Sequence, residues 1–504
     1  MKPFGSITNS LPFIEEEERE LVLKLVEESR NYDDFTEKLC EHVLSTVSSE
    51  VMVFVAYLHL VYTANYNAQK KFLDCFSEHL IIHFDNLRHQ MTDNAEWLTL
   101  LKEVNDAIAT NTNPLILLNL YEWKWNFTRS SSVGTVEEDK IIKEMTDLVD
   151  QSKSLEPVRA HVLILPAWRY SVECDHQKSL EAYESALQHA LTHDDVVFAA
   201  IIKTHMAKLL SLTDPSRALE IIESVAETEK ELGYLHRYPG SIGIMGIILD
   251  ARGEYNAAVK SLEDVLEIRG NQLLDLSPGF APAIITRAFR RMGNVEEALE
   301  WAKVGFTIKP HMSHRIQSMG VQVTANLNAS AAFAMLGRIE KAKSHLDVGN
   351  ELALKAGNEV WMSDVYLCKG LIERAEGNLT EALENFEDAL EITERLDRQG
   401  RINECLFLLA ETEIQLYIEN PKSDGVLALH WISVMEEMAR KKDLPGVLGL
   451  ALLLRARMNS LEGHTDVAQA TLNQVRDLSV NPGTRFLRDK IEILSSVSHQ
   501  RRRV

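Results

Sequence analysis

Residues 361–396 read WMSDVYLCKGLIERAEGNLTEALENFEDALEITERL, and this stretch predicts two helices joined by a tight turn. Gly377 ends the first helix, because glycine tolerates the left-handed backbone that commonly closes a helix. In the second helix, apolar and small residues recur three, four and seven positions apart, which places them on one face. These residues are Leu379, Ala382, Leu383, Phe386, Ala389, Leu390 and Thr393. The stretch therefore predicts a helical hairpin that needs neighbouring hairpins to bury its other faces.

A glycine in the first helix indicates where the two helices approach each other. Gly370 lies in mid-helix, where glycine costs about 1 kcal/mol relative to alanine. A close approach of the second helix would explain it, since Ala382 and Ala389 flank Phe386 on the facing side. Gly246 lies at the same spacing before a related stretch, and we expect the same packing role there.

The pattern recurs along the chain with a period of about 40 residues. Related stretches include GEYNAAVKSLEDVLEI from Gly253, GNVEEALEWAKVGFTIKP from Gly293 and GRIEKAKSHLDVG from Gly337. A small residue marks the second helix of each unit, at Ser179, Ala218, Ala258, Ala298, Ala342, Ala382, Ala428 and Ala468. Two longer connections, residues 308–323 and 417–425, are candidate functional loops or tolerated insertions. Eight stacked units predict an all-α fold, an α-solenoid with one continuous core.

These units resemble tetratricopeptide repeats. They share the small residue of the first helix, the glycine turn, the alanine–large–alanine face of the second helix and, at Pro310, a closing proline. The family's usual repeat has 34 residues. The longer period here implies longer helices or linkers, similar to the repeats of bacterial ligand-sensing regulators and kinesin light chains. Across about residues 160–480, the resemblance implies a right-handed α-solenoid of helical hairpins.

Three regions follow from where the pattern begins and ends. Residues 1–150 are predicted to be helical without the repeat signature, and form either a cap or decayed repeats. Residues 151–484 carry about eight repeats, and residues 485–504 form a capping helix with a basic tail. Within the first region, Val51–Tyr62 is strongly apolar but too short to span a bilayer, so we expect a buried helix.

Composition narrows the function classes. The formal net charge of −22 makes a nucleic-acid-binding surface improbable, since such surfaces rely on clustered lysine and arginine. The five cysteines are scattered, odd in number and free of any CxxC pair. This usage predicts reduced, buried thiols in a cytoplasmic protein. We expect neither a nucleic-acid nor a membrane partner.

The sequence contains no recognisable catalytic or cofactor motif. Three histidine pairs stand out: His79 with His83, His189 with His193, and His311 with His314. A metalloprotease helix needs a glutamate after the first histidine, whereas Leu80 and Ala190 follow His79 and His189. We therefore expect solvated or packed histidines, no metal, no cofactor and no enzymatic activity. An active site within residues 1–150 is the remaining enzymatic alternative.

The family resemblance also implies a binding surface. In tetratricopeptide proteins the first helices of successive repeats line a concave groove that holds an extended peptide or a partner helix. Projected onto this chain, the candidate groove residues are Lys203, Arg287, Arg290, Asn328, Arg374 and Arg457. Five are cations, which would attract a carboxylate or acidic segment to an otherwise acidic molecule. The alternative is that they are ordinary solvated helix positions.

We therefore expect a cytoplasmic scaffold or adaptor that binds a peptide or partner protein on its concave face. The second hypothesis is a ligand-sensing arm of a signalling or transcription regulator whose effector is a separate chain. Self-association is compatible with either hypothesis.

Overall fold

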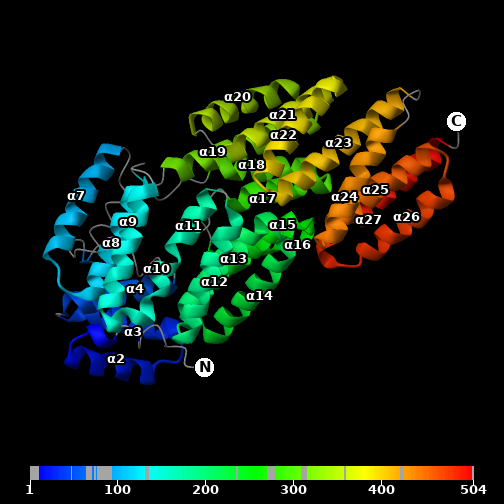
Figure 1. Cartoon of the computed structure of the whole chain (residues 1–504). Helices are drawn as coiled ribbons and strands as arrows, with labels where there is room; N and C mark the ends of the chain where they lie inside the picture. The colour runs from blue at the N-terminus through cyan, green and yellow to red at the C-terminus, as the bar shows by residue number, and fades with distance from the viewer. Residues whose placement is uncertain are drawn as a thin grey trace. The chain divides into compact units, whose positions relative to one another are not determined.

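The structure, a computed structural model, contains helices and turns and no strand among the residues it describes (Figure 1). Those residues are 9, 11–46, 48–63, 71–72, 75–76, 94–130, 135–173, 175–233, 237–269, 280–307, 315–356, 359–420 and 425–501. The predicted all-α fold is confirmed. The predicted loops 308–323 and 417–425 are shorter than expected. Residues 315–323 begin helix α19 (Arg315–Met335) and residues 417–419 end helix α23 (Gln399–Glu419), while residues 308–314 and 421–424 lie outside the described residues.

The chain forms two compact units. Unit 1 comprises residues 1–209, 223–241 and 312–315, and unit 2 comprises residues 210–222, 242–311 and 316–504. The predicted regions 1–150, 151–484 and 485–504 stay predictions, because they follow the repeat pattern and this division follows spatial proximity.

The helices of the N-terminal half belong mainly to unit 1. They are α2 (Glu16–Glu28), α3 (Tyr32–Ser45), α4 (Glu50–Thr63), α7 (Asn94–Thr110), α8 (Pro114–Ser130), α9 (Thr135–Gln151), α10 (Ala160–Leu163), α11 (Leu165–Val172), α12 (His176–Thr192), α13 (Val196–Thr213) and α14 (Pro215–Leu232). The C-terminal end of α13, residues 210–213, and the start of α14, residues 215–222, lie in unit 2.

The helices of the C-terminal half belong mainly to unit 2. They are α15 (Tyr238–Ala251), α16 (Tyr255–Arg269), α17 (Phe280–Met292), α18 (Val295–Thr307), α19 (Arg315–Met335), α20 (Ile339–Ala356), α21 (Glu359–Glu376), α22 (Leu379–Arg395), α23 (Gln399–Glu419), α24 (Val426–Lys441), α25 (Pro445–Leu461), α26 (Thr465–Leu478) and α27 (Phe486–Arg501).

The repeat pattern corresponds to a series of helical hairpins. Each of the eight marker residues lies on the second helix of a hairpin, on α12, α14, α16, α18, α20, α22, α24 and α26, and each is buried. In the hairpin α21–α22, Phe386 is fully buried between Ala382 and Ala389, as the small–large–small face predicts. Consecutive helices pack on one another, and the chain is a helical-repeat protein.

Two kinds of turn alternate along the array. Glycines with positive φ close the hairpins at Gly253, Gly293, Gly337, Gly377 and Gly463. Between hairpins, aspartates take the left-handed conformation, at Asp194, Asp397 and Asp443. Aspartate is one of the few side chains that visits this region readily, because its short polar group can bond locally. The backbone thus reverses direction at regular points that the sequence marks.

Gly370 packs as its position predicts. A Cβ atom built on Gly370 would overlap the ring of Phe386, so only glycine lets α21 and α22 approach this closely. The equivalent Gly246 on α15 is similar, since a Cβ there would lie 2.7 Å from Cγ of Leu262 on α16. Close helix packing therefore repeats from one hairpin to another.

Unit 1 has an aromatic core. Trp125, Tyr32, Phe35 and Phe54 are among its fully buried side chains. The predicted apolar segment forms the buried helix α4. Helix α13 is long and apolar enough to cross a membrane by length and composition, but 56% of that window is buried inside the protein, as in the core helix of a soluble protein.

The repeats of unit 2 curl back on one another. The turn at Gly253 lies against the start of α25, because a Cβ on Gly446 would overlap the carbonyl group of Gly253. The Asn403 side chain on α23 donates to the carbonyl oxygen of Ala251 on α15 at 3.0 Å. Helices far apart in the sequence, α15, α17, α21 and α23, therefore share one interior.

We predict that Gly370→Ala destabilises the protein by about 1–3 kcal/mol, since overpacking against the Phe386 ring outweighs the gain of roughly 1 kcal/mol in helix propensity. Urea denaturation measures this free energy of unfolding. Gly400→Ala is the matched control, because a Cβ there would lie 3.5 Å from Cα of Ala251, an ordinary contact. Equal stability of the two variants would contradict the close approach of α21 and α22.

Candidate functional site

The six predicted groove residues all lie on first helices of hairpins. Lys203 is half-buried on α13, Arg287 and Arg290 lie on α17, Asn328 on α19, Arg374 on α21 and Arg457 on α25. The buried amide of Asn328 donates to the carbonyl oxygen of Ala283 at 3.2 Å, which ties α19 to α17. The four arginines among these six residues belong to one charged region of unit 2.

Arginines of α17 pair with a buried carboxylate of α15. Nε and Nη2 of Arg287 donate to Oδ2 of Asp250 at 3.0 and 2.5 Å. Nη1 of Arg291 lies 3.5 Å from the same oxygen. Asp250 is buried, so these cations supply the charge compensation that a buried carboxylate requires.

Glu404 on α23 is the centre of the network. Arg290 donates to its Oε1 atom, and Arg291 donates to Oε2 at 2.5 Å. Arg401, one turn away, donates to Oε2 at 3.2 Å and also to Oδ2 of Asp364 on α21 at 2.6 Å. The Glu404 side chain is 2% exposed. Three arginines thus surround one carboxylate in the interior of unit 2.

The pKa values of the two buried carboxylates move in opposite directions. Burial alone would raise the pKa of Glu404, but Arg290, Arg291 and Arg401 hold it well below its usual range. Burial raises the pKa of Asp364, because only Arg401 contacts it closely and the charge of Glu404 adds repulsion. Glu404 is therefore an anchored anion, whereas Asp364 is held less strongly in its charged form.

A pocket opens beside this network in unit 2. Its volume is about 590 Å³, including solvent at its mouth. Its polar lining is Tyr255, Arg290, Arg291, Arg374, Asn403, Glu404, Glu411 and Lys490, and its apolar lining includes Met335, Phe407, Leu408, Met435, Val447 and Leu450. Four cations face two carboxylates, so the pocket is cationic in a chain whose net charge is −22.

The mouth of the pocket carries a second charged group. Nη1 of Arg374 donates to Oε2 of Glu411 at 2.7 Å. Burial would raise the pKa of Glu411, but Arg374 lowers it, with weaker help from Lys490 and Arg457. Burial lowers the pKa of the Lys490 amine, and Glu411 opposes that shift. Arg374 is the direct partner of Glu411, and Lys490 lines the same pocket as a further cation.

Polar atoms of the network remain unsatisfied. Nε of Arg290, Nε of Arg291 and Oδ1 of Asp250 are buried without a hydrogen-bond partner. Such atoms are uncommon in folded proteins, and each calls for a physical reason such as a bound ligand or water. Arg290 and Arg291 both line the pocket, so a ligand with acceptor oxygens would suit them.

The structure changes what the predicted cations can do. Arg287, Arg290 and Arg374 each hold a carboxylate of the protein itself. The residues that complete the site were missed: Asp250, Arg291, Asp364, Arg401, Glu404, Glu411 and Lys490. For Glu404 a weak signal was available, because it directly precedes the apolar run of residues 405–410, and a carboxylate buried beside such a run needs partners. Lys490 carried no such signal.

Among the described residues, one group could hold a metal ion: Glu156, His189 and His193 of unit 1. The pairs His79–His83 and His311–His314 lie outside the described residues.

Comparisons with known proteins add little. No protein-family model matches the chain, and no curated protein does. Among solved structures, a Rap protein complexed with competence and sporulation factor is similar with 12% identity and a TM-score of 0.42, over 68% of this chain and 99% of that one. The apo form of RapI has 12% identity and a TM-score of 0.40, over 75% and 98% of the two chains. Aspartyl phosphate phosphatase F from Bacillus subtilis has 11% identity and a TM-score of 0.36, over 87% and 96%.

We predict that Glu404→Gln lowers the free energy of unfolding by roughly 3–5 kcal/mol, because it leaves three buried arginines without their shared anion. Urea denaturation at pH 7 measures the loss. Glu391→Gln on the exposed face of α22 is the matched control, with an expected change within about 0.5 kcal/mol. Equal effects of the two substitutions would show that the network is not the anchor described here.

The same variant gives a pH test. The folded-state pKa of Glu404 lies below that of an unfolded glutamate, about 4.3, so its charge stabilises the fold above that pH and stops doing so as the pH falls through the folded value. The stability difference between wild type and Glu404→Gln should therefore be largest near pH 7 and shrink below about pH 4. Urea midpoints measured at both pH values check this. A difference that grows on acidification would contradict the direction of the shift.

Proposed function

We propose that this chain is a non-enzymatic binding protein, a scaffold or adaptor built from tetratricopeptide-like repeats, which binds a peptide or protein segment at the pocket of unit 2. The observation that carries the proposal is the excess of cations over carboxylates in a pocket that also has an apolar wall. Convergent polar groups on an apolar lining are typical of ligand sites.

The recognised group would be a carboxylate. Arg374 donates to Glu411 and Lys490 lines the same pocket, so a second carboxylate there would gain charge-assisted hydrogen bonds. The space for water-sized groups is small, which suits one side chain or a chain end and not a bulky cofactor. Met335, Met435 and Leu450 would contact the apolar part of that residue. We infer a peptide that ends in an apolar residue with a free carboxylate.

The cysteines support a cytoplasmic location within this proposal. Cys40, Cys368 and Cys405 are free and buried, and burial raises the pKa of Cys368 to about 12, whereas Cys75 is free and exposed, so the prediction of buried thiols is wrong for Cys75. Thiols held protonated in this way are unreactive core residues, which suits a reducing compartment.

We predict that a library of random octapeptides with free C-terminal carboxylates yields binders whose affinity falls at least about tenfold when the C-terminus is amidated. Lys490→Met should weaken the same peptides at least about tenfold, since it removes a cation from the mouth without leaving an unpaired buried charge. Fluorescence anisotropy measures both effects. Lys303→Met, on the exposed face of α18, is the control and should bind as wild type does.

Two outcomes would contradict this proposal. Amidated and free peptides that bind equally would exclude carboxylate recognition. A library without binders would exclude the peptide ligand. Small carboxylic acids that then raise the melting temperature of wild type, but not of Lys490→Met, would favour the second hypothesis, the ligand-sensing arm of a regulator.

A further inference from the structure

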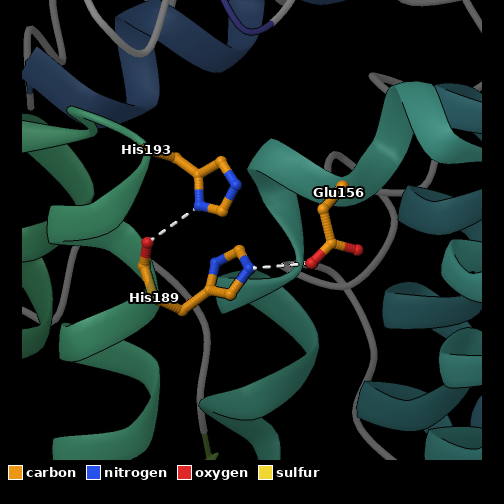
Figure 2. Close-up of side chains that lie close together, drawn as sticks. All are labelled: Glu156, His189 and His193. Carbon is orange, nitrogen blue, oxygen red and sulfur yellow. Dashed lines mark hydrogen bonds and ion pairs between the residues drawn. The ribbon is translucent and has the colours of Figure 1, made fainter.

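Three potential metal ligands of unit 1 lie together away from the pocket residues in sequence. Glu156 belongs to the 3-10 helix η2 (Lys153–Val158), and His189 and His193 lie one turn apart at the C-terminal end of α12. One ligand atom of each lies within 4.8 Å of the others (Figure 2). Imidazole and carboxylate are the ligands that zinc and similar divalent ions take in proteins.

The distance between the first two ligand atoms fits a metal ion. Nε2 of His189 lies 3.3 Å from Oε1 of Glu156. Two ligands at zinc bond lengths of about 2.0–2.2 Å are roughly 3.3–3.5 Å apart at the tetrahedral angle. An ion can therefore replace the hydrogen bond between these groups without moving their backbones.

The Glu156 carboxylate is already oriented by a neighbour. Nε and Nη2 of Arg159 donate to Oε2 at 3.0 and 2.7 Å, and Nη2 also donates to Oδ1 of Asp150 at 2.7 Å. Arg159 shares Oε1 as well, at 3.1 Å. Metal-bound carboxylates are commonly held by such outer hydrogen bonds. Asp150 offsets the charge of Arg159, so Glu156 keeps its negative charge for a cation.

The third ligand, His193, has its tautomer assigned by the backbone. Its Nδ1 atom lies 3.1 Å from the carbonyl oxygen of His189, so Nδ1 carries the proton and Nε2 holds the lone pair. Figure 2 shows the other ring nitrogen of His193 on the side of Glu156. This bond holds in the present orientation of the ring.

Binding requires one rearrangement. The rings of His189 and His193 are stacked, with centroids 4.3 Å apart and an angle of 22° between their planes. Lone pairs of stacked rings do not converge, so the His193 ring has to turn toward Glu156. His193 is the C-cap residue of α12 and is half-exposed, which leaves its side chain room to turn.

His189 is suited to the same role. Its side chain is 15% exposed, and its Nε2 atom already faces Oε1 of Glu156 at 3.3 Å. The Glu156 side chain is 44% exposed, which leaves an open side for a water ligand.

We propose that Glu156, His189 and His193 form a binding site for one divalent ion of the zinc class, with a water molecule as the fourth ligand. This site is separate from the pocket of the proposed function and does not depend on it. The proposal differs from the expectation from sequence, which is a packed or solvated His189–His193 pair without a metal. The sequence pattern does not show the third ligand, because Glu156 lies 33 residues earlier in the chain than His189.

The test is zinc binding by the full chain, after chelator treatment and dialysis. Wild type should bind one equivalent of Zn²⁺ with a dissociation constant below about 10 μM, measured by competition with a chromophoric chelator. Co²⁺ in place of Zn²⁺ should show the visible absorption of a four-coordinate ion. His193→Asn and Glu156→Gln should each weaken Zn²⁺ binding at least about tenfold.

The control is His464→Ala, because His464 is exposed and lies 3.5 Å from Glu462 without a third ligand nearby. This variant should bind as wild type does. Both test substitutions are at partly exposed positions and keep the size of a polar side chain, and circular dichroism checks that they are folded. The proposal is overturned if wild type binds no Zn²⁺ below about 10 μM, or if the Glu156→Gln/His193→Asn double variant binds it unchanged.

Discussion

The interior of unit 2 depends on one buried carboxylate. Glu404 on α23 accepts hydrogen bonds from Arg290 and Arg291 of α17, and from Arg401 one turn away. An ion pair of this kind is weak evidence for net stability, but a charge left alone in the same place is strongly unfavourable. The helices that carry these residues must therefore keep their mutual register. Hairpins that could otherwise stack with slightly different curvature are held in one arrangement.

The pocket is a consequence of the same constraint. Because the arginines outnumber the carboxylates around it, the wall shared with the network is cationic, and Lys490 of α27 adds a charge at the mouth. Arginines whose donors were all paired within the protein would have no hydrogen-bond donor left for a ligand. Here, the Nε atoms of Arg290 and Arg291 are buried without partners, and burial lowers the pKa of the Lys490 amine. The carboxylate ligand that we propose would use these groups.

The unit 1 cluster is built differently. His189 and His193 are neighbours by helix periodicity alone, whereas Glu156 reaches them from a short 3-10 helix. The sequence therefore indicated the histidine pair of that site by its spacing, but it did not indicate Glu156. The pocket shows the same division, since Arg290 and Arg374 were recognised as candidates on the correct helices while their partners, Glu404 and Glu411, were not.

The sequence alone determined the helical hairpins, because each depends on local features: a glycine turn, a small residue at Ala382 or its equivalents, and Gly370 facing Phe386. The eight marker residues are buried for the same local reason, since helical spacing assigns them to one face. Only the tertiary structure decided which charges meet. Arg290 and Glu404 are 114 residues apart, and their contact depends on the curvature accumulated over several hairpins. That curvature is the sum of the small rotations between successive hairpins, and the periodicity of the sequence does not specify those rotations.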